Sequence, residues 1–354
     1  MKRGRSGFAD TGPAFMAALL SALIWIVFFP VWLVAVIVYE AHAVLSSRKL
    51  GISGTALSPM AMRWLQHRLG LRRDEACAKL IKVLPNHSYL GLWAATFPVW
   101  LGHRLTGFVP KMLRYPYEGI PPVGHSSSVR STFVDAAIER YLPGVEQFVE
   151  LGAGYDTRTV QLQHNRRIRC YEIDLPKTQQ IKRELLHQCG VDISGIKFVS
   201  ANFLTDNWLD HLAKTDFDPR KSTFFLWEGV TYYLSREAME KTFRTVATIA
   251  PGSVVVFDYA TVANIKAYPL DLLAKAILKA VRESQTFWIS SEPPVKKKLA
   301  ALMDAYGLSL REHLNYGCET KRKRSFGGLA TAVLSDLSKK DALDGSTSMA
   351  DLGR

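Results

Sequence analysis

One short run, VELGAG at residues 149–154, constrains the fold of this chain more than any other segment. An apolar stretch leads to a carboxylate, Glu150, and two glycines follow one residue apart, Gly152 and Gly154. A helix-favouring segment comes next. Glycines leave a turn free of side chains, so a ligand can approach the backbone closely. The run therefore predicts a strand that turns tightly into a helix, with a nucleotide-like ligand at the turn.

The residue three places after the second glycine narrows the class of ligand. A dinucleotide fingerprint has a third glycine there, whereas this chain has Thr157. The acid-x-Gly-x-Gly form favours S-adenosylmethionine, whose sulfonium and amino acid tail need no pyrophosphate cradle. Two alternatives stay open. One is a chance Gly-x-Gly turn, and the other is a structural role in which Glu150 and Asp156 order the loop and cap the next helix. Arg158 is expected to be a structural partner of Asp156.

Apolar runs recur after this turn and alternate with helical patterns. Such alternation predicts a parallel, doubly wound sheet with its ligand at the carboxyl ends of the strands. Asp174 lies about twenty residues after the first loop, where a carboxylate can accept both ribose hydroxyl protons. Asn202 suits an adenine edge, and Glu228 follows the next apolar run. The further strands are predicted at 168–176, 197–203, 222–227, 253–257, 308–314 and 326–334, with a helix at 236–249.

Four motifs in order, VELGAGYDTRTVQL, YEIDLP, FLWEGVTYYL and APGSVVVFDY, carry a resemblance to a known family. Across residues 126–335 the chain resembles the leucine carboxyl methyltransferase family of class I S-adenosylmethionine-dependent enzymes. The resemblance implies a Rossmann-like, mostly parallel, seven-stranded sheet. It also implies S-adenosylmethionine as cofactor and O-methylation, usually of a carboxylate or another oxygen on a protein terminus or a small molecule.

The resemblance also implies which residues hold the cofactor. Gly152 would lie against its amino acid end, Asp174 on the ribose, and Arg130 at its carboxylate. Asn202 and Phe203 would flank the adenine, although the family more often has an acidic residue where Asn202 stands. An amide can still donate and accept hydrogen bonds there. The full set of expected cofactor-binding residues is Arg130, Glu150, Gly152, Gly154, Asp174, Asn202, Phe203 and Glu228.

Methyl transfer from a sulfonium needs few catalytic groups from the protein. Displacement at an activated sulfonium methyl group can be driven by positioning, which supplies roughly 7–11 kcal/mol of a barrier. A carboxylate acceptor is ionised near neutral pH and needs no base, whereas a hydroxyl acceptor needs one. His125 is the nearest candidate base, because the strand-end motifs contain no histidine or lysine. This favours a carboxylate acceptor. No catalytic residue and no metal site is assigned.

The amino-terminal segment has a different character. Residues 14–38 are almost wholly apolar, and a helix of that length reaches about 37 Å, more than the roughly 30 Å hydrocarbon core of a bilayer. We interpret residues 1–48 as a basic leader and a membrane anchor, which Pro30 would kink or divide into two short re-entrant helices. The alternatives are a signal peptide cleaved after the AHA trio at 41–43 and a buried core helix.

A second apolar stretch, residues 88–101, is too short for an upright span and contains Pro98. We expect it to face the membrane beside the anchor; an interfacial or re-entrant element and a lid helix are the alternatives. More basic residues follow the anchor than precede it, which favours a catalytic domain in the cytosol. The expected organisation is a helical cap at 49–125, the methyltransferase domain at 126–335 with a helical insertion at 261–291, and a disordered tail at 336–354.

The composition supports a membrane rather than a nucleic-acid partner. The chain has a formal charge of +13 without a basic-aromatic binding module, and much of the excess lies near the apolar segments. The four cysteines show no spacing typical of metal sites or disulfides, and Cys170 is expected to be buried. The acceptor and the oligomeric state stay unassigned. Two other functions are considered, a catalytically silent cofactor-binding membrane scaffold and a nicotinamide-dependent reductase.

Overall fold

The computed structural model describes residues 11–50, 54, 56–122, 125–261, 289–320 and 324–335. Within these residues lies a seven-stranded sheet with the strand order β3-β2-β1-β4-β5-β7-β6. The first five strands pair in parallel, and β7 runs antiparallel to both β5 and β6. The predicted doubly wound, mostly parallel sheet is confirmed. The strands are β1 (Gln147–Leu151), β2 (Arg169–Asp174), β3 (Ile196–Ser200), β4 (Thr223–Trp227), β5 (Val254–Ala260), β6 (Leu308–Asn315) and β7 (Gly327–Leu334).

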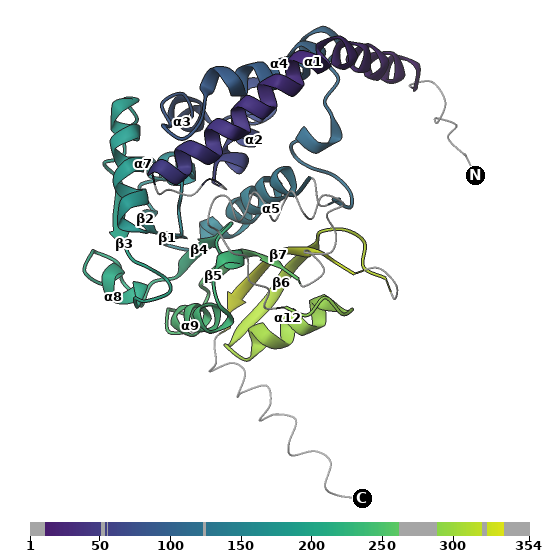
Figure 1. The fold of residues 1–354 in the computed structure, drawn as a ribbon. Helices are drawn as coiled ribbons and strands as arrows, with labels where there is room; N and C mark the ends of the chain where they lie inside the picture. The colour runs from purple at the N-terminus through teal and green to yellow at the C-terminus, as the bar shows by residue number, and fades with distance from the viewer. Residues whose placement is uncertain are drawn as a thin grey trace, which may run out of the picture.

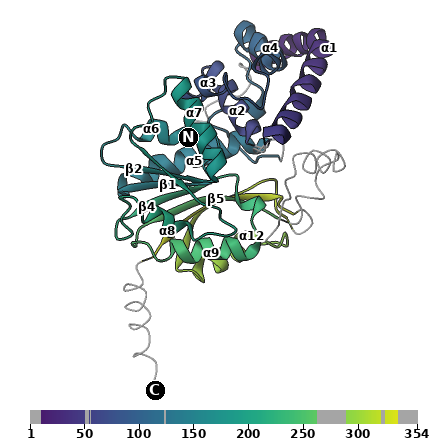
Figure 2. The same ribbon diagram turned by 60° about the vertical axis from the view of Figure 1, so that its left-hand side comes forward.

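Helices cover both faces of this sheet, as Figure 2 shows. Side chains alternate along each strand, so Phe148 packs against α5 on one face while Val149 and Leu151 face α8, α9 and α12 on the other. The helices besides α1 are α2 (Leu57–Arg68), α3 (Glu75–Leu80), α4 (Tyr89–Thr106), α5 (Ser126–Tyr141), α6 (Arg158–Leu162), α7 (Pro176–Gln188), α8 (Trp208–Leu212), α9 (Arg236–Val246) and α12 (Val295–Asp304). Short 3-10 helices lie at η1 (Lys111–Leu113), η3 (Leu142–Gly144) and η4 (Thr231–Tyr233).

The register of the parallel strands brings the expected site residues to one edge. Glu150 pairs with Glu172 of β2 and with Leu226 of β4, so the carboxyl ends of these strands lie side by side. All residues of β1, β4 and β5 are buried, as expected for central strands of a sheet covered on both faces. β5 continues to Ala260, so Asp258 lies inside the strand rather than after it.

The amino-terminal part forms a helical layer beside the sheet, with α1 (Thr11–Leu50) and α4 next to each other (Figure 1). Pro30 lies inside one continuous helix, so of the two alternatives for Pro30, a kink or a division into two short helices, the division is excluded. α1 still changes direction along its length (Figure 2). Its last turns belong to the core of the cap, because Tyr39 and Ala43 are buried there and Ser47 accepts a hydrogen bond from Asn86. The expected boundary at residue 48 therefore falls inside a packed helix.

α4 packs antiparallel beside α1, so residues 88–101 lie beside the expected anchor. Phe28 and Phe97 meet edge to face at 5.4 Å, and the hydroxyls of Ser21 and Thr106 are 3.1 Å apart. The predicted burial of Cys170 is confirmed. Most of the expected insertion, residues 262–288, and the expected tail, residues 336–354, lie outside the described residues.

Candidate active site

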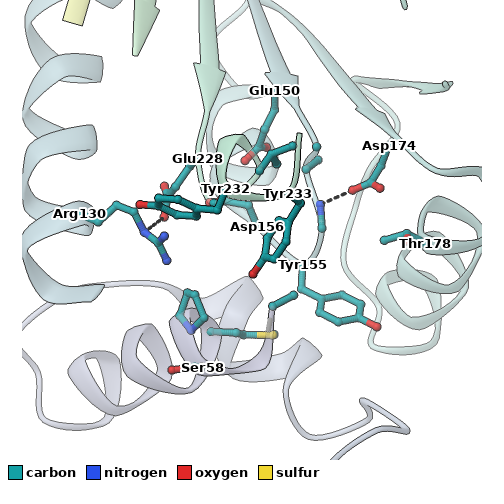
Figure 3. Close-up of a pocket in the computed structure, with 18 of the residues that line it drawn as sticks. Ser58, Arg130, Glu150, Tyr155, Asp156, Asp174, Thr178, Glu228, Tyr232 and Tyr233 are labelled. Carbon is teal, nitrogen blue, oxygen red and sulfur yellow. Dashed lines mark hydrogen bonds and ion pairs between the residues drawn. The ribbon is translucent and has the colours of Figure 1, made fainter. Parts of the chain in front are cut away.

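A cavity of about 660 Å³ opens at the carboxyl edge of the sheet. Its walls come from the strand ends and from α2 of the cap, which approaches from the opposite side (Figure 3). All the residues expected to bind the cofactor line this cavity: Arg130, Glu150, Gly152, Gly154, Asp174, Asn202, Phe203 and Glu228. Residues far apart in the sequence thus meet around one space of a size usual for a small-molecule site.

The two glycines of the turn have different surroundings. Gly152 has a φ of +74°, and a Cβ atom there would lie 2.3 Å from Cγ2 of Val230. Gly154 has a φ of +44°, and the nearest atom to its added Cβ would be Cβ of Ala56 at 3.9 Å. Position 152 therefore requires glycine for two reasons, the positive φ angle and the close approach of Val230. Gly154 faces the open cavity, where a side chain would occupy room that a ligand could use.

Asp174 ends β2 and lies beside the glycine turn, as the sequence predicted. One carboxylate oxygen accepts the N–H of Gly154 at 2.6 Å, and the other accepts the N–H of Leu175 at 2.6 Å. Burial raises the pKa of Asp174, and these two N–H groups oppose the shift. Each carboxylate oxygen has a second lone pair. The side chain is thus held in place by the turn and can still accept hydrogen bonds from a ligand.

Glu150 presents a carboxylate oxygen that lacks a protein partner. The residue is buried, and among the described residues its Oε2 atom finds no hydrogen-bond donor. Burial, followed by the nearby Asp156 carboxylate, holds the pKa of Glu150 well above its usual range. A buried, unsatisfied polar atom on a cavity wall marks a place where a bound group would supply the missing hydrogen bond.

Arg130 of α5 is already paired within the protein. Its Nε lies 3.0 Å from Glu228, and its Nη1 donates to Asp258 at 2.9 Å. Asp258 also accepts the N–H of Gly229. The sequence placed Arg130 and Glu228 separately on the cofactor. The structure shows them as an ion pair on the cavity wall, so each fixes the other's position there.

The amide of Asn202 is partly used by its own turn. Its side-chain oxygen accepts the N–H of Leu204 at 3.0 Å, and its backbone N–H donates to Asp206 at 2.9 Å. The sequence predicted a side chain that both donates and accepts at the adenine. The oxygen keeps a second lone pair beside the one that serves the turn, and the side-chain amide can also donate toward the cavity.

The expected base candidate, His125, does not line the cavity. Its Nδ1 atom lies 2.9 Å from the hydroxyl of Tyr117, and burial lowers the pKa of the ring. The next residues, Ser126 and Ser127, do reach the cavity wall, as do Tyr232 and Tyr233. The histidine is thus turned toward a tyrosine that precedes α5.

A network of buried ion pairs fixes the loop behind the glycine turn. Arg158 pairs with Asp156, as predicted, and also with Asp135 and with Glu228 at 2.7 Å each. Arg63 of α2 reaches the same loop, with its Nη1 atom 2.7 Å from Asp156. The loop is therefore held from two sides, by the sheet domain and by the cap.

Thr157, which replaces a fingerprint glycine, has a structural use. Its hydroxyl donates to Asp74 of the cap at 2.8 Å and accepts from Arg63 at 2.9 Å. Arg63 and Asp74 are themselves paired at 2.7 Å and are buried. Arg63 and Asp74 could not be found from the sequence, because each lies more than eighty positions from Thr157 and no local pattern links them.

The charges on the cavity wall favour a cationic ligand. The charged residues that line it are two arginines and four carboxylates, namely Arg63, Arg130, Glu150, Asp156, Asp174 and Glu228. Both arginines are engaged by acidic partners, and Arg158 behind the wall pairs with Asp156 and Glu228. Among the described residues, Glu150 and Asp174 are the two carboxyl groups of the wall without an arginine partner, and a bound positive group would favour their ionised forms.

Comparisons with known proteins point to one family. The model of the leucine carboxyl methyltransferase family matches residues 116–247. The chain is 32% identical over 209 residues to FRAAL3836 of Frankia alni, a match that covers 58% of this chain and 69% of that protein. It is 31% identical over 182 residues to YktD of Bacillus subtilis, covering 49% of this chain and 57% of that protein. Both are named as candidate S-adenosyl-L-methionine-dependent methyltransferases.

The extent of these matches varies. The chain spans about half the length of several curated relatives that it matches, for example 57% of YktD and 43% of a Mycobacteroides abscessus protein. Among solved structures, the methyltransferase domain of bacterial CtHen1-C overlaps with a TM-score of 0.41 and 12% identity, covering 58% of this chain and 97% of that chain. On the family match and the Frankia alni relative, the chain belongs to the leucine carboxyl methyltransferase family of S-adenosylmethionine-dependent methyltransferases.

Proposed function

We propose that this chain binds S-adenosylmethionine in the cavity at the sheet edge and transfers its methyl group to an oxygen atom of an acceptor at a membrane. One observation carries the proposal: the glycine turn, Asp174 and the unpartnered Glu150 line one cavity that has an excess of carboxylates. S-adenosylmethionine carries a sulfonium and an ammonium group, and the charge of the wall suits both.

Different residues on the cavity wall would contact different parts of S-adenosylmethionine. The turn of Gly152 and Gly154 would lie against the amino acid end, with Gly154 leaving the cavity open, and the free Glu150 oxygen suits its ammonium group. Asp174, held by two backbone N–H groups, would accept hydrogen bonds from the ribose. Asn202 would donate to the adenine, and Phe203 would pack against it. The Arg130–Glu228 pair would border the amino acid carboxylate.

The lining of the cavity favours a carboxylate acceptor. When bound, the cofactor supplies an activated methyl group, so the protein has to orient the acceptor and exclude water. Among the described residues that line the cavity there is no histidine and no lysine. Burial, followed by Asp258, holds the pKa of Tyr232 well above its usual range, so this phenol stays protonated. A carboxylate is ionised near pH 7 and needs no base.

The amino-terminal helix supports a membrane location. Among the described residues, one helix is long and apolar enough to cross a bilayer, at Phe15–Leu50, and 6% of its most apolar window is buried. Large apolar side chains such as Ile26 and Val27 are about 70% exposed to the surroundings. α2 follows α1 in the chain and lines the cavity. We infer that the catalytic domain lies on the cytosolic side, where its cofactor is made, and that the acceptor is a lipid, a small acid or a protein terminus.

Incubation of the full chain with methyl-labelled S-adenosylmethionine and a membrane extract tests this proposal. A carboxyl methyl ester releases its label as volatile methanol after mild alkali, whereas a methyl ether keeps it. We expect a labelled product that alkali destroys, and no product with Asp174→Ala. Binding of S-adenosylhomocysteine without any product would favour a silent scaffold. Absence of S-adenosylhomocysteine binding would remove the proposal and reopen the reductase alternative.

A further inference from the structure

The α1–α4 pair has a defined antiparallel register. Ser21 lies against Gly102, where an added Cβ would be 3.2 Å from the serine hydroxyl. Phe28 contacts Phe97 farther along, and Tyr39 lies near Gly91 toward the cap. The carboxyl end of α4 therefore lies beside Ser21, far along α1 from the cap, and its amino end lies near the cap.

The far end of α4 is tied back to the catalytic domain. Residues 107–110 are not helical, and the next residues bind to the body of the protein. The carbonyl of Met112 accepts from Ser128 of α5 at 2.6 Å, and that of Leu113 accepts from Gln66 of α2 at 3.2 Å. The six residues that follow Thr106, up to Met112, can span only about 20 Å. Figure 1 shows this segment running from the end of α4 down toward α5.

This tether is incompatible with a simple transmembrane α1. The carboxyl end of α4, which is tied to the catalytic domain, lies beside Ser21. Only the part of α1 from Thr11 to Ser21 extends beyond that point. This part is about 15 Å long, half the thickness of a hydrocarbon core. If the apolar residues 15–38 crossed the bilayer, the non-helical residues 107–110 and the exposed Arg104 would lie in hydrocarbon. Lipid-exposed irregular backbone does not occur there, and a charged side chain is costly.

We propose that the α1–α4 hairpin embeds in a single leaflet of an anionic bilayer, so that both ends of the hairpin stay on the side of the catalytic domain. This inference rests on the proposed membrane association and adds its topology. Apolar side chains of both helices are exposed, including Leu90 and Leu105 of α4. They would lie among the acyl chains of that leaflet.

Basic and aromatic residues mark the level of the lipid headgroups. Arg68 lies over the rings of Trp64, Trp93 and Trp100 at 5.1–5.4 Å. Arg68 also donates to Thr96 at 3.3 Å, so this cluster lies beside the middle of α4, and Arg104 is exposed near its carboxyl end. Tryptophan and arginine are typical of the membrane–water interface, and the arginines suit anionic headgroups. Because arginines lie both beside the middle and near the carboxyl end of α4, this helix lies along the leaflet rather than through it.

Protease protection of the full chain, carrying a different epitope at each end, tests the topology. In sealed membrane vesicles with the cytosolic face outward, we expect protease to remove both epitopes. Protection of the amino-terminal epitope alone would show a span and overturn the proposal. A chain that stays in the supernatant would overturn the membrane association itself. Neither outcome bears on methyl transfer, which is measured separately.

Binding to vesicles made of equal parts phosphatidylglycerol and phosphatidylcholine tests the headgroup contact. Arg104→Glu should weaken sedimentation with these vesicles by roughly thirtyfold, since a basic residue near an anionic surface contributes about 1 kcal/mol and reversal counts twice. Lys297→Glu, the same charge change at an exposed position on α12, should bind like the wild type. Unchanged binding by Arg104→Glu, or equal losses in both variants, would contradict the proposed placement of α4.

Discussion

Gly152 and Gly154 look equivalent in the sequence but stand in different surroundings. An alanine at 152 would require a positive φ and would drive its Cβ into Val230, whereas an alanine at 154 would meet open space. We expect Gly154→Ala to cost about 1–2 kcal/mol of stability from backbone strain alone. Gly152→Ala should cost more, because Val230 must also move. Urea unfolding of the two detergent-solubilised variants measures the difference, and equal costs would contradict the close approach of Val230.

Thr157 ties the cap to the loop behind the glycine turn through one hydroxyl. Thr157→Val keeps the shape of the side chain but removes its bonds to Asp74 and Arg63. We expect a loss of about 1–3 kcal/mol, the cost of leaving buried polar groups unpaired. Thr157→Ser keeps the hydroxyl and should lose less. The midpoint of urea unfolding checks this order, and the reverse order would show that the methyl group of Thr157 matters more.

Asp135 gives the network a pH dependence. Burial opposes ionisation, but ion pairs with Arg158 and Arg72 prevail and lower the pKa of Asp135 to about 2. A lowered pKa in the folded state stabilises the protein above the unfolded value of about 4, and this stability is lost as the pH falls through about 2. Asp135→Asn should therefore cost about 2 kcal/mol at pH 7 and about half as much at pH 3. A pH-independent difference in unfolding free energy would contradict this.

At the residue scale, the sequence located the strand-end residues but not their protein partners. Asp174 could be placed because it ends a strand at a fixed distance from the glycine turn. The pairing of Arg130 with Asp258 joins residues 128 positions apart, and only the folded sheet brings them together. The sequence offered His125 as a candidate base, but proximity to a serine run does not determine which way a ring turns, and His125 does not line the cavity.

At the level of elements, α2 connects the membrane helix to the cofactor cavity. Arg63, on this helix, is buried and binds Asp74 and Asp156. Removing one partner of a buried ion pair leaves charge uncompensated and costs about 3–5 kcal/mol. We expect Arg63→Gln to destabilise the chain by that amount and to weaken S-adenosylhomocysteine binding.

Arg73→Gln provides the matched control for Arg63→Gln. Its side chain is 87% exposed and pairs with Glu75, and such surface pairs contribute about 0–1 kcal/mol. Unfolding and calorimetric titration of both variants should separate them clearly. Similar behaviour of the two arginine variants would show that α2 does not support the loop.

The elements themselves were largely predictable, because each has a strong local signal. The strands followed from apolar runs ending at polar residues, and α9 from the helical pattern at 236–249, although the helix ends at Val246. α1 was predictable as a helix, but its end was not. Its last turns bury Tyr39 and Ala43 against the cap, and such tertiary packing extends a helix beyond the point where its apolar run stops.

For the whole molecule, the helical layer and the sheet domain share one core at α2 and α3. Removing residues 1–48 would therefore take away Tyr39, Ala43 and Ser47, which pack in the cap. A deletion that ends at residue 38 leaves these contacts and removes the exposed apolar part. We expect that shorter deletion to leave a folded chain that sediments with membranes more weakly, because α4 keeps its own exposed apolar side chains. Undiminished sedimentation would place the attachment on α4 alone.

The central claim is that the glycine turn and Asp174 form a binding site for S-adenosylmethionine. Calorimetric titration of the full chain with S-adenosylhomocysteine tests it most directly, with Asp174→Ala as the site variant and Asp192→Ala, an exposed acid after α7, as its control. The account predicts saturable binding by the wild type and by Asp192→Ala, and none by a folded Asp174→Ala. Equal binding by all three chains, or no binding by the wild type, would contradict it.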